Sequence, residues 1–526
     1  MLVALLAGLL SDGAAAAVTQ TDAHGTVLVD GKKVFPIVLA KGPERGSTTP
    51  SGADAPGEVV DAGVNFFKVG PASRPWWPED KADATAWDQE AAERGVYTWV
   101  NLATLADAEP GKLKDTRLRE VVNLLENDPA LAMWKGADEP WLAGFSPEEL
   151  GYAYCVSTSV GVPSWCQEPV DDAHLWVTIQ APRGMAQDLA PYSSVTDVHG
   201  VDDYPVTWDK RDDPNLHEVG EWTQRIASVT PNEAVWTTLQ VCASGSSGPN
   251  PGEFVLPTRK QERYMIYDAI LNGAHSLGFY GGNIDRCWTD TDAQFRWNWT
   301  YWNTVLKELV QEINADSPIA PALVDPGSTQ VLASSDATTQ GISREGANGE
   351  LWVIAARSGT GSSQVTISGL PSGWTSGTVY TEGRSVTAAD GSFTDTFEQW
   401  DVNVYRFAAP PPPPPPPPPV SLPPAPPPAP PPPSLVPLAR DTTPPGTRIT
   451  AAPSRRTKIR RAKFRFVSTE AGSVFQCKLG RKQWTPCRSP KLYRELAKGL
   501  HVFRVRARDA AGNADPTPAV RSWRIR

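Results

Sequence analysis

Short apolar runs alternate with helix-like segments over residues 27–315 of this chain. Eight of the runs have the length and the flanking turn residues of β-strands. Between them, segments such as Leu118–Leu125 and Arg263–Leu271 carry apolar residues at helical spacing. This alternation predicts a (β/α)8 barrel. The predicted strands are Val34–Ala40, Val64–Val69, Val96–Leu102, Leu131–Ala137, Leu175–Gln180, Val195–Asp202, Ala234–Val241 and Ser276–Tyr280.

A β-hairpin is predicted before the first strand–helix unit. Val27–Val29 and Lys33–Phe35 flank the dipeptide Asp30-Gly31, which favours a type I′ turn. We expect this hairpin to form an N-terminal lid on the barrel.

The pattern changes after the barrel. Residues 318–407 contain short alternating strands that are separated by Gly, Ser and Pro, a pattern typical of an antiparallel β-sandwich. These predicted strands are Leu351–Ile354, Gln364–Ile367, Thr378–Tyr380 and Val402–Phe407. Residues 440–526 repeat the pattern with Lys463–Val467, Ser473–Leu479 and His501–Ala507.

A proline-rich segment separates the two β-rich regions. It contains an unbroken proline run from Pro410 to Pro419, which favours polyproline II and a semi-rigid linker. A proline-rich ligand for another protein is the alternative. We therefore divide the chain into a signal peptide (1–17), a barrel (18–317), a β-sandwich (318–407), a linker (408–439) and a second β-domain (440–526).

The N-terminus and the cysteines both indicate export. Residues 2–10 form a short apolar run that four alanines follow at 14–17, as in a secretory signal peptide. The usual basic start is missing, so a buried N-terminal helix is the alternative. The chain has six cysteines, and their spacing suggests the disulfides Cys155–Cys166, Cys242–Cys287 and Cys477–Cys487. We expect a secreted or cell-surface protein.

Charge is divided unevenly along the chain. Residues 440–526 hold 22 Lys and Arg against 5 Asp and Glu, whereas the rest of the chain holds 27 against 54. For an exported protein, anionic cell-envelope polymers or membrane surfaces are favoured over nucleic acid as partners of this basic domain, and a merely solvated basic face is the favoured alternative to any partner. No long apolar run predicts a transmembrane segment after the N-terminus. No P-loop, GxGxxG or HExxH motif occurs, so we expect neither cofactor nor metal, and we expect a monomer.

The most informative motif is Trp134-Lys135-Gly136-Ala137-Asp138-Glu139-Pro140. It ends the fourth predicted strand with two carboxylates and a proline. In a (β/α)8 barrel, side chains at the C-terminal ends of strands point into the mouth where chemistry takes place. Trp134 and Trp141 could supply the apolar surroundings that raise the pKa of a carboxyl group.

Several segments, in this order, resemble the (β/α)8 glycoside hydrolases of the clan whose acid/base follows the fourth strand. They are Asp61–Asn65, Val100–Leu102, Ala137–Pro140, Asp202–Pro205 and Gly273–Tyr280. The resemblance implies that Glu139 protonates the glycosidic oxygen and that Asp138 occupies the position of an asparagine that binds the sugar. Residues 475–477, 484–487, 499–503 and 508–513 resemble the Ig-like modules of exported bacterial proteins, particularly actinobacterial ones.

The chain departs from this family at the seventh strand. The family places its nucleophilic glutamate there, and this chain has Gln240, which cannot act as a nucleophile. Asp202 is our first candidate for the second carboxylate, because the Asp-x-Tyr-Pro turn would direct it toward the mouth. Glu253 and Asp285 are alternatives.

Tryptophans in the predicted loops are candidate platforms for sugar rings. We expect Trp76, Trp77 and Trp141 to bind substrate together with Asp138, Tyr204 and Gln240. For Trp297, Trp299 and Trp302, on a predicted helix, core packing is favoured.

The sequence therefore predicts an exported glycoside hydrolase that uses Glu139 and Asp202 for acid/base catalysis on O-glycosidic bonds. The alternative is a non-catalytic carbohydrate-binding or cell-surface adhesion protein on a degenerate glycosidase barrel. Gln240 motivates this alternative.

Overall fold

The computed structural model describes residues 17–158, 173–212, 214–230, 233–244, 253–409 and most of 444–525. The chain forms two compact units, Met1–Pro414 and Pro415–Arg526. The predicted signal peptide, the linker and Cys166 lie mostly or wholly outside the described residues. Within the described part of the chain, no helix is long and apolar enough to cross a membrane.

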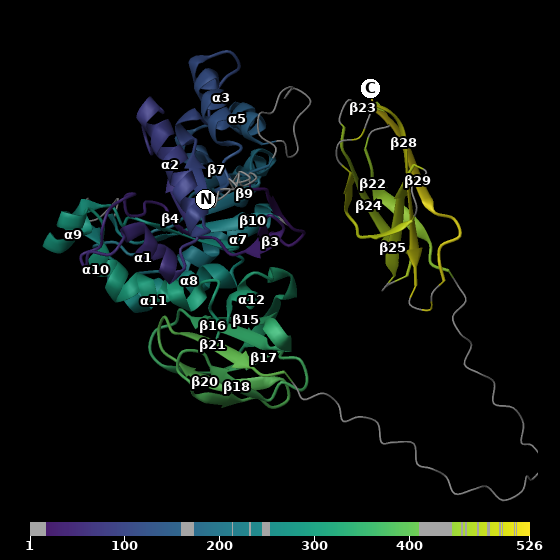
Figure 1. Ribbon diagram of the computed structural model, residues 1–526. Coiled ribbons are helices and arrows are strands. Elements are labelled where there is room, and N and C mark those ends of the chain that lie inside the picture. Colours follow the sequence, from purple (N-terminus) through teal and green to yellow (C-terminus); the bar gives the residue numbers. More distant parts are fainter. Residues whose placement is uncertain are drawn as a thin grey trace, which may run out of the picture. The chain divides into compact units, whose positions relative to one another are not determined.

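Eight parallel strands close into a barrel in the first unit, as predicted (Figure 1). The central strands are buried on both faces, which explains why the sequence reads there as continuous apolar runs. In chain order, the barrel strands are β4 (Ile37–Leu39), β5 (Phe66–Val69), β6 (Tyr97–Asn101), β7 (Leu131–Asp138), β8 (Leu175–Gln180), β9 (Val198–Asp202), β10 (Ala234–Gln240) and β13 (Ser276–Tyr280).

Helices connect the barrel strands. They are α1 (Ala55–Ala62), α2 (Pro78–Arg94), α3 (Leu113–Leu125), α4 (Pro140–Ala143), α5 (Pro147–Ser157), α6 (Ala186–Leu189), α7 (Glu218–Val229) and α8 (Arg259–Leu271). After β13 follow α9 (Asp290–Phe295), α10 (Trp299–Tyr301), α11 (Lys307–Ile313) and α12 (Ala320–Leu323). The short helical turns η1 (Ala103–Leu105), η2 (Ala190–Val195), η3 (Asp285–Cys287), η4 (Trp302–Leu306) and η5 (Pro326–Ser328) complete this region.

Local sequence sets where these helices begin. Ser146 accepts a hydrogen bond from the Glu149 N–H, and the Glu149 carboxylate accepts one from the Ser146 N–H. This capping box starts α5, and Thr258 with Gln261 starts α8 in the same way. Such caps satisfy backbone N–H groups that the helix itself leaves unpaired.

The predicted hairpin is present and covers the N-terminal end of the barrel. It pairs β2 (Val27–Val29) with β3 (Lys32–Val34), and β1 (Thr19–Thr21) adds a third strand. Asp30 and Gly31 both have positive φ, as a type I′ turn requires. Val27 and Val29 pack in the same apolar cluster as Val38 and Phe66 of the barrel.

The predicted strand Val34–Ala40 is divided in the structure. Val34 ends β3 of the hairpin and Ile37 begins the barrel strand β4. Pro36 lies between them, and its missing N–H cannot join either ladder. The prediction therefore merged two elements that have separate partners.

An antiparallel sheet of eight strands follows the barrel in the same unit. Its strands are β14 (Gln330–Ser334), β15 (Thr339–Glu345), β16 (Leu351–Arg357), β17 (Ser363–Ser368), β18 (Ser376–Val379), β19 (Ser385–Thr387), β20 (Ser392–Phe397) and β21 (Val402–Phe407), with η6 (Ala347–Gly349) between β15 and β16. Figure 1 shows α8 and α12 next to this sheet, and α8 contacts β16. Ile342, Trp352 and Val404 join the large apolar core of the barrel.

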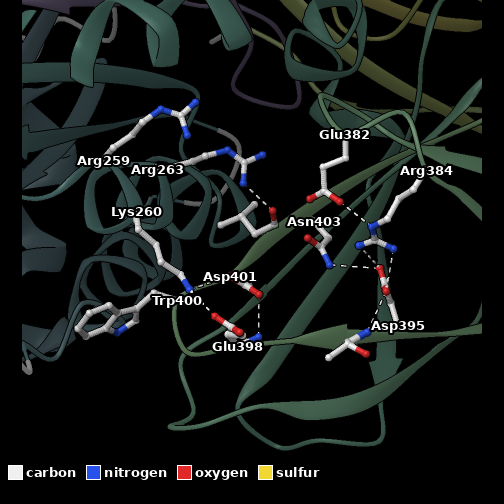
Figure 2. Close-up of a pocket in the computed structure, with 12 residues that line it drawn as sticks. Arg259, Lys260, Arg263, Glu382, Arg384, Asp395, Glu398, Trp400, Asp401 and Asn403 are labelled. Atoms are coloured by element: carbon white, nitrogen blue, oxygen red, sulfur yellow. Dashed lines mark hydrogen bonds and ion pairs between the residues drawn. The ribbon is translucent and has the colours of Figure 1, made fainter. Parts of the chain in front are cut away.

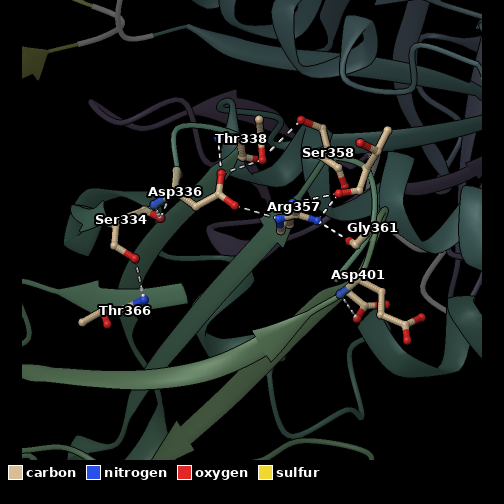
Figure 3. Close-up of polar contacts among 12 residues, drawn as sticks. Ser334, Asp336, Thr338, Arg357, Ser358, Gly361, Thr366 and Asp401 are labelled. Carbon is tan, nitrogen blue, oxygen red and sulfur yellow. Dashed lines mark hydrogen bonds and ion pairs between the residues drawn. The ribbon is translucent and has the colours of Figure 1, made fainter. Parts of the chain in front are cut away.

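A buried arginine fixes the loops next to the end of β16, an inner strand of this sheet (Figure 3). The Arg357 Nε donates to Asp336 at 2.8 Å, and its Nη1 donates to the carbonyl oxygens of Gly359 and Gly361. Hydrogen bonds from Arg357 and Thr338 lower the pKa of Asp336 to about 2. The cation is therefore paired and closes the loop that follows β16.

The second unit consists of two antiparallel-rich sheets around a small aromatic core. One sheet contains β22 (Thr447–Ala451), β24 (Ala462–Ser468) and β27 (Lys491–Tyr493). The other contains β23 (Arg456–Thr457), β25 (Val474–Leu479), β26 (Thr485–Cys487), β28 (Gly499–Arg508) and β29 (Ala519–Ile525). The rings of Phe464 and Phe503 stack with centroids 3.9 Å apart in the core.

Two of the three predicted disulfides are confirmed. Cys242 is bonded to Cys287, which ties the residues after β10 to η3 beyond β13. Cys477 is bonded to Cys487 across β25 and β26. The predicted pair of Cys155 with Cys166 involves a residue outside the described part.

Candidate active site

A cavity of 280 Å³ lies in the mouth of the barrel. Its walls come from the C-terminal ends of seven of the eight barrel strands or from the residues just beyond, and the eighth, β6, contributes Trp99. The polar lining residues are Lys68, Lys135, Asp138, Glu139, Asp202, Tyr204, Thr238 and Tyr280. Four of the residues predicted as site residues, Asp138, Glu139, Asp202 and Tyr204, therefore meet in one place.

Glu139 leaves the strand in a left-handed backbone conformation, with φ of 45°. Its N–H donates to the carbonyl oxygen of Ile179 on β8 at 2.7 Å, which anchors the turn. Non-glycine residues adopt this conformation at a cost that the surrounding structure must offset. Burial, and then the charge of Asp138, raise the pKa of Glu139.

An irregularity in β7 brings two side chains of opposite charge into the mouth. Lys135 and Asp138 are an odd number of residues apart, so a regular strand would direct them to opposite faces. The pairing of β7 with β8 shifts register between them, and their side chains form an ion pair. Gly136 permits this, because a Cβ there would lie 2.0 Å from the Trp176 Nε1.

The Lys135–Asp138 pair holds Asp138 in its charged form. Burial would raise the pKa of Asp138, but Lys135 and Lys68 together lower it below the ordinary value. The Lys135 residue is only 2% exposed, so the ammonium group is held inside the mouth while the Asp138 side chain remains open to solvent.

Asp202 ends β9, and its pKa is shifted in the opposite direction from that of Asp138. Burial, and then the charges of Glu139 and Asp138, raise the pKa of Asp202 to about 7. Its Oδ2 accepts a hydrogen bond from the Tyr204 hydroxyl at 3.1 Å, and its Oδ1 has no hydrogen-bond partner among the described residues. The Tyr204 ring stacks on Tyr280 with centroids 5.6 Å apart, which fixes the hydroxyl in place.

Lys68 on β5 is a second lysine at the mouth. Its Nζ lies 5.6 Å from the centre of the Trp99 ring, and Trp99 packs on Trp236 in the floor of the barrel. Burial, followed by the positive charge of Lys135, lowers the pKa of Lys68 to about 7. The described residues provide it with no ion-pair partner.

The structure does not support the predicted sugar-binding role of Trp76. Trp76 is 3% exposed, its Nε1 donates to the Asn101 carbonyl oxygen, and its ring packs against Gly70. The flanking prolines suggested an exposed loop, whereas the close approach of Gly70 buries the ring. Neither of its faces is open to a sugar.

Trp77 and Trp141 lie outside the residues that line the mouth cavity. Trp77 is 47% exposed, and the guanidinium of Arg74 lies over its ring at 4.0 Å. Trp141 is half-buried against Leu189 and Val201 beside α7. Trp297, Trp299 and Trp302 are buried, which confirms the expected core packing.

Gln240 is fully buried and does not line the mouth cavity. Its Oε1 accepts from the Val206 N–H at 3.1 Å, and its Nε2 donates to the Val206 carbonyl oxygen at 2.7 Å. The amide is therefore saturated by backbone, and the predicted substrate contact through Gln240 is wrong. Glu253 and Asp285 are exposed and also lie outside the cavity.

A larger hollow of 780 Å³ lies between α8 and the antiparallel sheet (Figure 2). Its charged side chains already have partners, such as Lys260 with Asp401 at 2.8 Å and Arg384 with Asp395 at 2.7 Å. Arg263 pairs with Glu312 and also donates to the Val402 carbonyl oxygen. These contacts join the barrel to the sheet, so the hollow is a seam between two packed parts.

The described residues contain no group of three or more His, Cys, Asp or Glu that could hold a metal ion. The side chains that line the mouth cavity offer carboxyl, amine, hydroxyl and phenol groups.

Four polar residues of the cavity, Lys68, Lys135, Thr238 and Tyr280, were not among the predicted site residues. A signal for the lysines was present, because each interrupts an otherwise apolar strand, in Phe66–Val69 and Leu131–Ala137. A charged residue within a buried strand requires a partner or a function.

No protein-family model matches the chain. No curated protein matches it either. Among solved structures, it is similar to an α-amylase from Anoxybacillus at 12% identity and a TM-score of 0.45, with 71% of this chain and 98% of that chain covered.

Two further solved structures show the same likeness of fold. An endoxylanase of glycoside hydrolase family 30 from Clostridium papyrosolvens is 11% identical, with a TM-score of 0.42 and coverage of 75% of this chain and 98% of that chain. A β-L-arabinopyranosidase of family 27 from Geobacillus stearothermophilus is 10% identical, with a TM-score of 0.44 and coverage of 71% and 96%.

Proposed function

We propose that this chain is an exported glycoside hydrolase that cleaves O-glycosidic bonds with Glu139 and Asp202. The observation that carries the proposal is the pair of carboxyl groups in one cavity whose pKa values are both raised. Hydrolysis of a glycosidic bond requires one carboxyl group that keeps a proton and a second that is ionised. Burial and negative charge supply this state, since burial and then the charges of Glu139 and Asp138 raise the pKa of Asp202.

The proton belongs to Asp202 in this proposal. Asp202 lines the cavity and has a pKa of about 7, so it is protonated at mildly acidic pH. Glu139 is then the ionised partner, which assists water or attacks the anomeric carbon. This exchanges the two roles expected from the sequence and keeps the same two residues.

Asp138 has a supporting role. Its ion pair with Lys135 keeps it charged, and its side chain is 61% exposed toward the mouth. A fixed carboxylate of this kind accepts hydrogen bonds from sugar hydroxyl groups. Tyr204 holds Asp202 through its hydroxyl and contributes an aromatic face to the cavity.

Aryl glycosides with different leaving groups test the two roles. A 2,4-dinitrophenolate departs without protonation, whereas a poor leaving group requires an acid. Asp202→Asn should therefore lose about 10²–10⁴-fold in kcat/KM on poor leaving groups and much less on 2,4-dinitrophenyl glycosides. Glu139→Gln should lose activity on both.

Asp285→Asn is the matched control, because Asp285 is an exposed carboxylate outside the cavity. Its kinetics should equal those of the unchanged protein. Full activity of Glu139→Gln on both kinds of glycoside would contradict the proposal.

The second candidate function is a non-catalytic carbohydrate-binding protein. The saturated amide of Gln240 favours it, because β10 ends without a carboxylate. This candidate predicts glycan binding without any product after long incubation.

We also propose that the second unit attaches the protein to anionic polymers of the cell envelope. Arg504, Arg506 and Arg508 alternate on β28 with the buried residues Phe503, Val505 and Ala507, so the arginines share the outer face. Lys478 on β25 lies opposite Arg504 on β28 in the register of the sheet.

The two disulfides are consistent with an exported protein.

A further inference from the structure

A second hollow of 290 Å³ lies beside the mouth cavity, and the two share Lys68. We call it the flanking pocket. Its walls are formed by Lys41 after β4, by Lys68 on β5, by Trp87 on α2 and by Asn283, Trp288 and Arg296 after β13. Lys68 therefore lies in the wall of both hollows, where it can meet a ligand in either of them.

The charges of the flanking pocket do not cancel. Its two carboxylates already have cations, since Glu44 pairs with Arg296 at 3.5 Å and Asp83 pairs with Arg45 at 3.6 Å. Lys41 and Lys68 have no ion pair or side-chain hydrogen bond with any residue that the structure describes. The pocket thus presents two lysine side chains that form no ion pair with the described residues, although the charge of Asp138 in the mouth cavity acts on Lys68.

Aromatic side chains form the rest of the wall. Trp87 stacks on Phe67 with ring centroids 5.1 Å apart. The Trp288 Nε1 donates to the Gly282 carbonyl oxygen at 3.0 Å, which fixes the indole beside the pocket. Indole rings offer flat apolar faces to the C–H groups of sugar rings.

We infer that the flanking pocket binds an anionic sugar unit, in which a carboxylate or a sulfate ester pairs with Lys68 and Lys41 while the ring packs against the tryptophans. This inference rests on the proposed glycosidase function, because it makes the flanking pocket a subsite of the same substrate. The substrate class is then an acidic polysaccharide.

The protonation of Lys68 gives this subsite a pH dependence. The groups that act on Lys68 are Lys135 and Asp138 from β7, Lys41 after β4 and Asp202 from β9, and its pKa is about 7. A bound anion favours the ammonium form, so affinity should be full below pH 7 and should decrease as the pH rises through 7.

Calorimetric titration of the full chain carrying Glu139→Gln tests the inference without turnover. The carboxylate probes are oligogalacturonates and alginate oligosaccharides, each compared with its methyl ester, which keeps the ring and removes the charge. The sulfate probes are carrageenan oligosaccharides compared with their desulfated forms. We expect at least one acidic probe to bind at least tenfold more tightly than its neutral counterpart at pH 6 and low salt.

Three variants in the same background locate the effect. Lys68→Met should lower affinity for the acidic probe at least tenfold and reduce the decrease between pH 6 and pH 8, leaving only the part that ionisation of Asp202 causes. Lys41→Gln should lower affinity for the acidic probe severalfold. Because Lys41 is exposed, this substitution should leave the fold intact. Lys32→Gln is the control, because Lys32 is an exposed lysine of the hairpin at the other end of the barrel, and its affinity should be unchanged.

Equal affinity for acidic and neutral forms of every probe would overturn the inference, as would unchanged binding in both Lys68→Met and Lys41→Gln. Failure of the proposed function has a different signature. If an acidic glycan binds through Lys68 but is never cleaved by the unaltered chain, the proposed glycosidase function is wrong and the anionic subsite is supported. If the unaltered chain cleaves neutral glycans alone and acidic probes bind no more tightly than neutral ones, the glycosidase function is supported and the anionic subsite is wrong.

Discussion

At the scale of single residues, the mouth of the barrel separates the pKa values of neighbouring carboxyl groups. Asp138 and Asp202 lie in the same cavity, yet the pKa of the first is lowered and that of the second is raised to about 7. The two pKa values differ because different charged groups lie next to each carboxyl group. Lys135 touches Asp138, and its attraction exceeds the effect of burial, whereas the charges that act most strongly on Asp202 are negative.

This arrangement predicts how activity depends on pH. Asp202 must be protonated to donate, and its pKa is about 7. The kcat/KM should therefore decrease above pH 7 with an apparent pKa near that value, which a pH–rate profile measures. In Asp202→Asn, measured on a 2,4-dinitrophenyl glycoside, this alkaline limb should disappear. A limb that persists unchanged in the variant would assign it to another group.

The stability of Asp202→Asn provides a check on the same pKa. A carboxyl group whose pKa is raised by folding stabilises the protein at low pH, and that contribution is lost as pH rises from about 4 to 7. Replacement by a neutral amide should therefore raise the melting temperature at pH 8 relative to the unaltered protein. At pH 4 the two proteins should differ much less.

At the scale of elements, the irregularity in β7 is the feature that assembles the site. Gly136 lies where a Cβ would meet the indole of Trp176, and the register shift beside it directs both Lys135 and Asp138 to the mouth. Bulges often redirect side chains next to active sites. The position of the Lys135–Asp138 pair thus depends on a residue that has no chemistry of its own.

Gly136→Ala should destabilise the protein by about 1–3 kcal/mol, because the new methyl group has no space. It should also reduce activity, since Asp138 and the following Glu139 would shift. Gly341→Ala on β15 is the matched control, because its added Cβ would meet its nearest neighbour at an ordinary 3.6 Å. Chemical denaturation and kinetics of both variants measure the two effects. Equal stability of Gly136→Ala and Gly341→Ala would refute this account of the bulge.

Much of the fold could be predicted because buried parallel strands leave a strong apolar signal. The strand predicted at Leu131–Ala137 is observed at Leu131–Asp138. Strand ends also indicated Glu139, Asp202 and Tyr204, because the barrel directs such residues to its mouth. Val195–Asp202 was too long by its first three residues, since Val195 belongs to the turn η2 before β9.

The remaining parts of the site depend on contacts that spacing does not reveal. Trp76 is buried by Gly70, at the start of the same connection between β5 and α2, and by Asn101 at the end of β6. Gln240 is occupied by the backbone of Val206, in the preceding loop. The placement of Lys135 required the register shift against β8, which only the three-dimensional pairing shows.

At the scale of the whole molecule, the two units carry different chemistry. The first unit holds the mouth cavity and a sheet that shares the barrel's apolar core. In the second unit, the ring of Trp484 lies 4.5 Å from the Arg506 guanidinium and 4.7 Å from the Lys478 ammonium. Cations held over an indole remain available to anions on their outer side.

The proposed attachment of the second unit predicts retention of the full chain on insoluble bacterial cell walls at low salt. Retention should decrease as ionic strength rises, because exposed charges are screened within about 10 Å at 0.1 M salt. Replacing Arg504 and Arg506 together by glutamine should reduce retention severalfold and leave hydrolysis by the barrel unchanged. Retention that is insensitive to both salt and these substitutions would exclude electrostatic attachment.

The central claim is that Glu139 and Asp202 hydrolyse a glycosidic bond in the barrel mouth. The most direct test is the release of new reducing ends from a panel of neutral and acidic polysaccharides by the unaltered protein, Glu139→Gln and Asp202→Asn. We predict release from at least one polysaccharide by the unaltered protein and a loss of at least 10²-fold in each variant, with all three proteins folded. Equal release by the unaltered protein and the two variants, or no release from any polysaccharide, would contradict the claim.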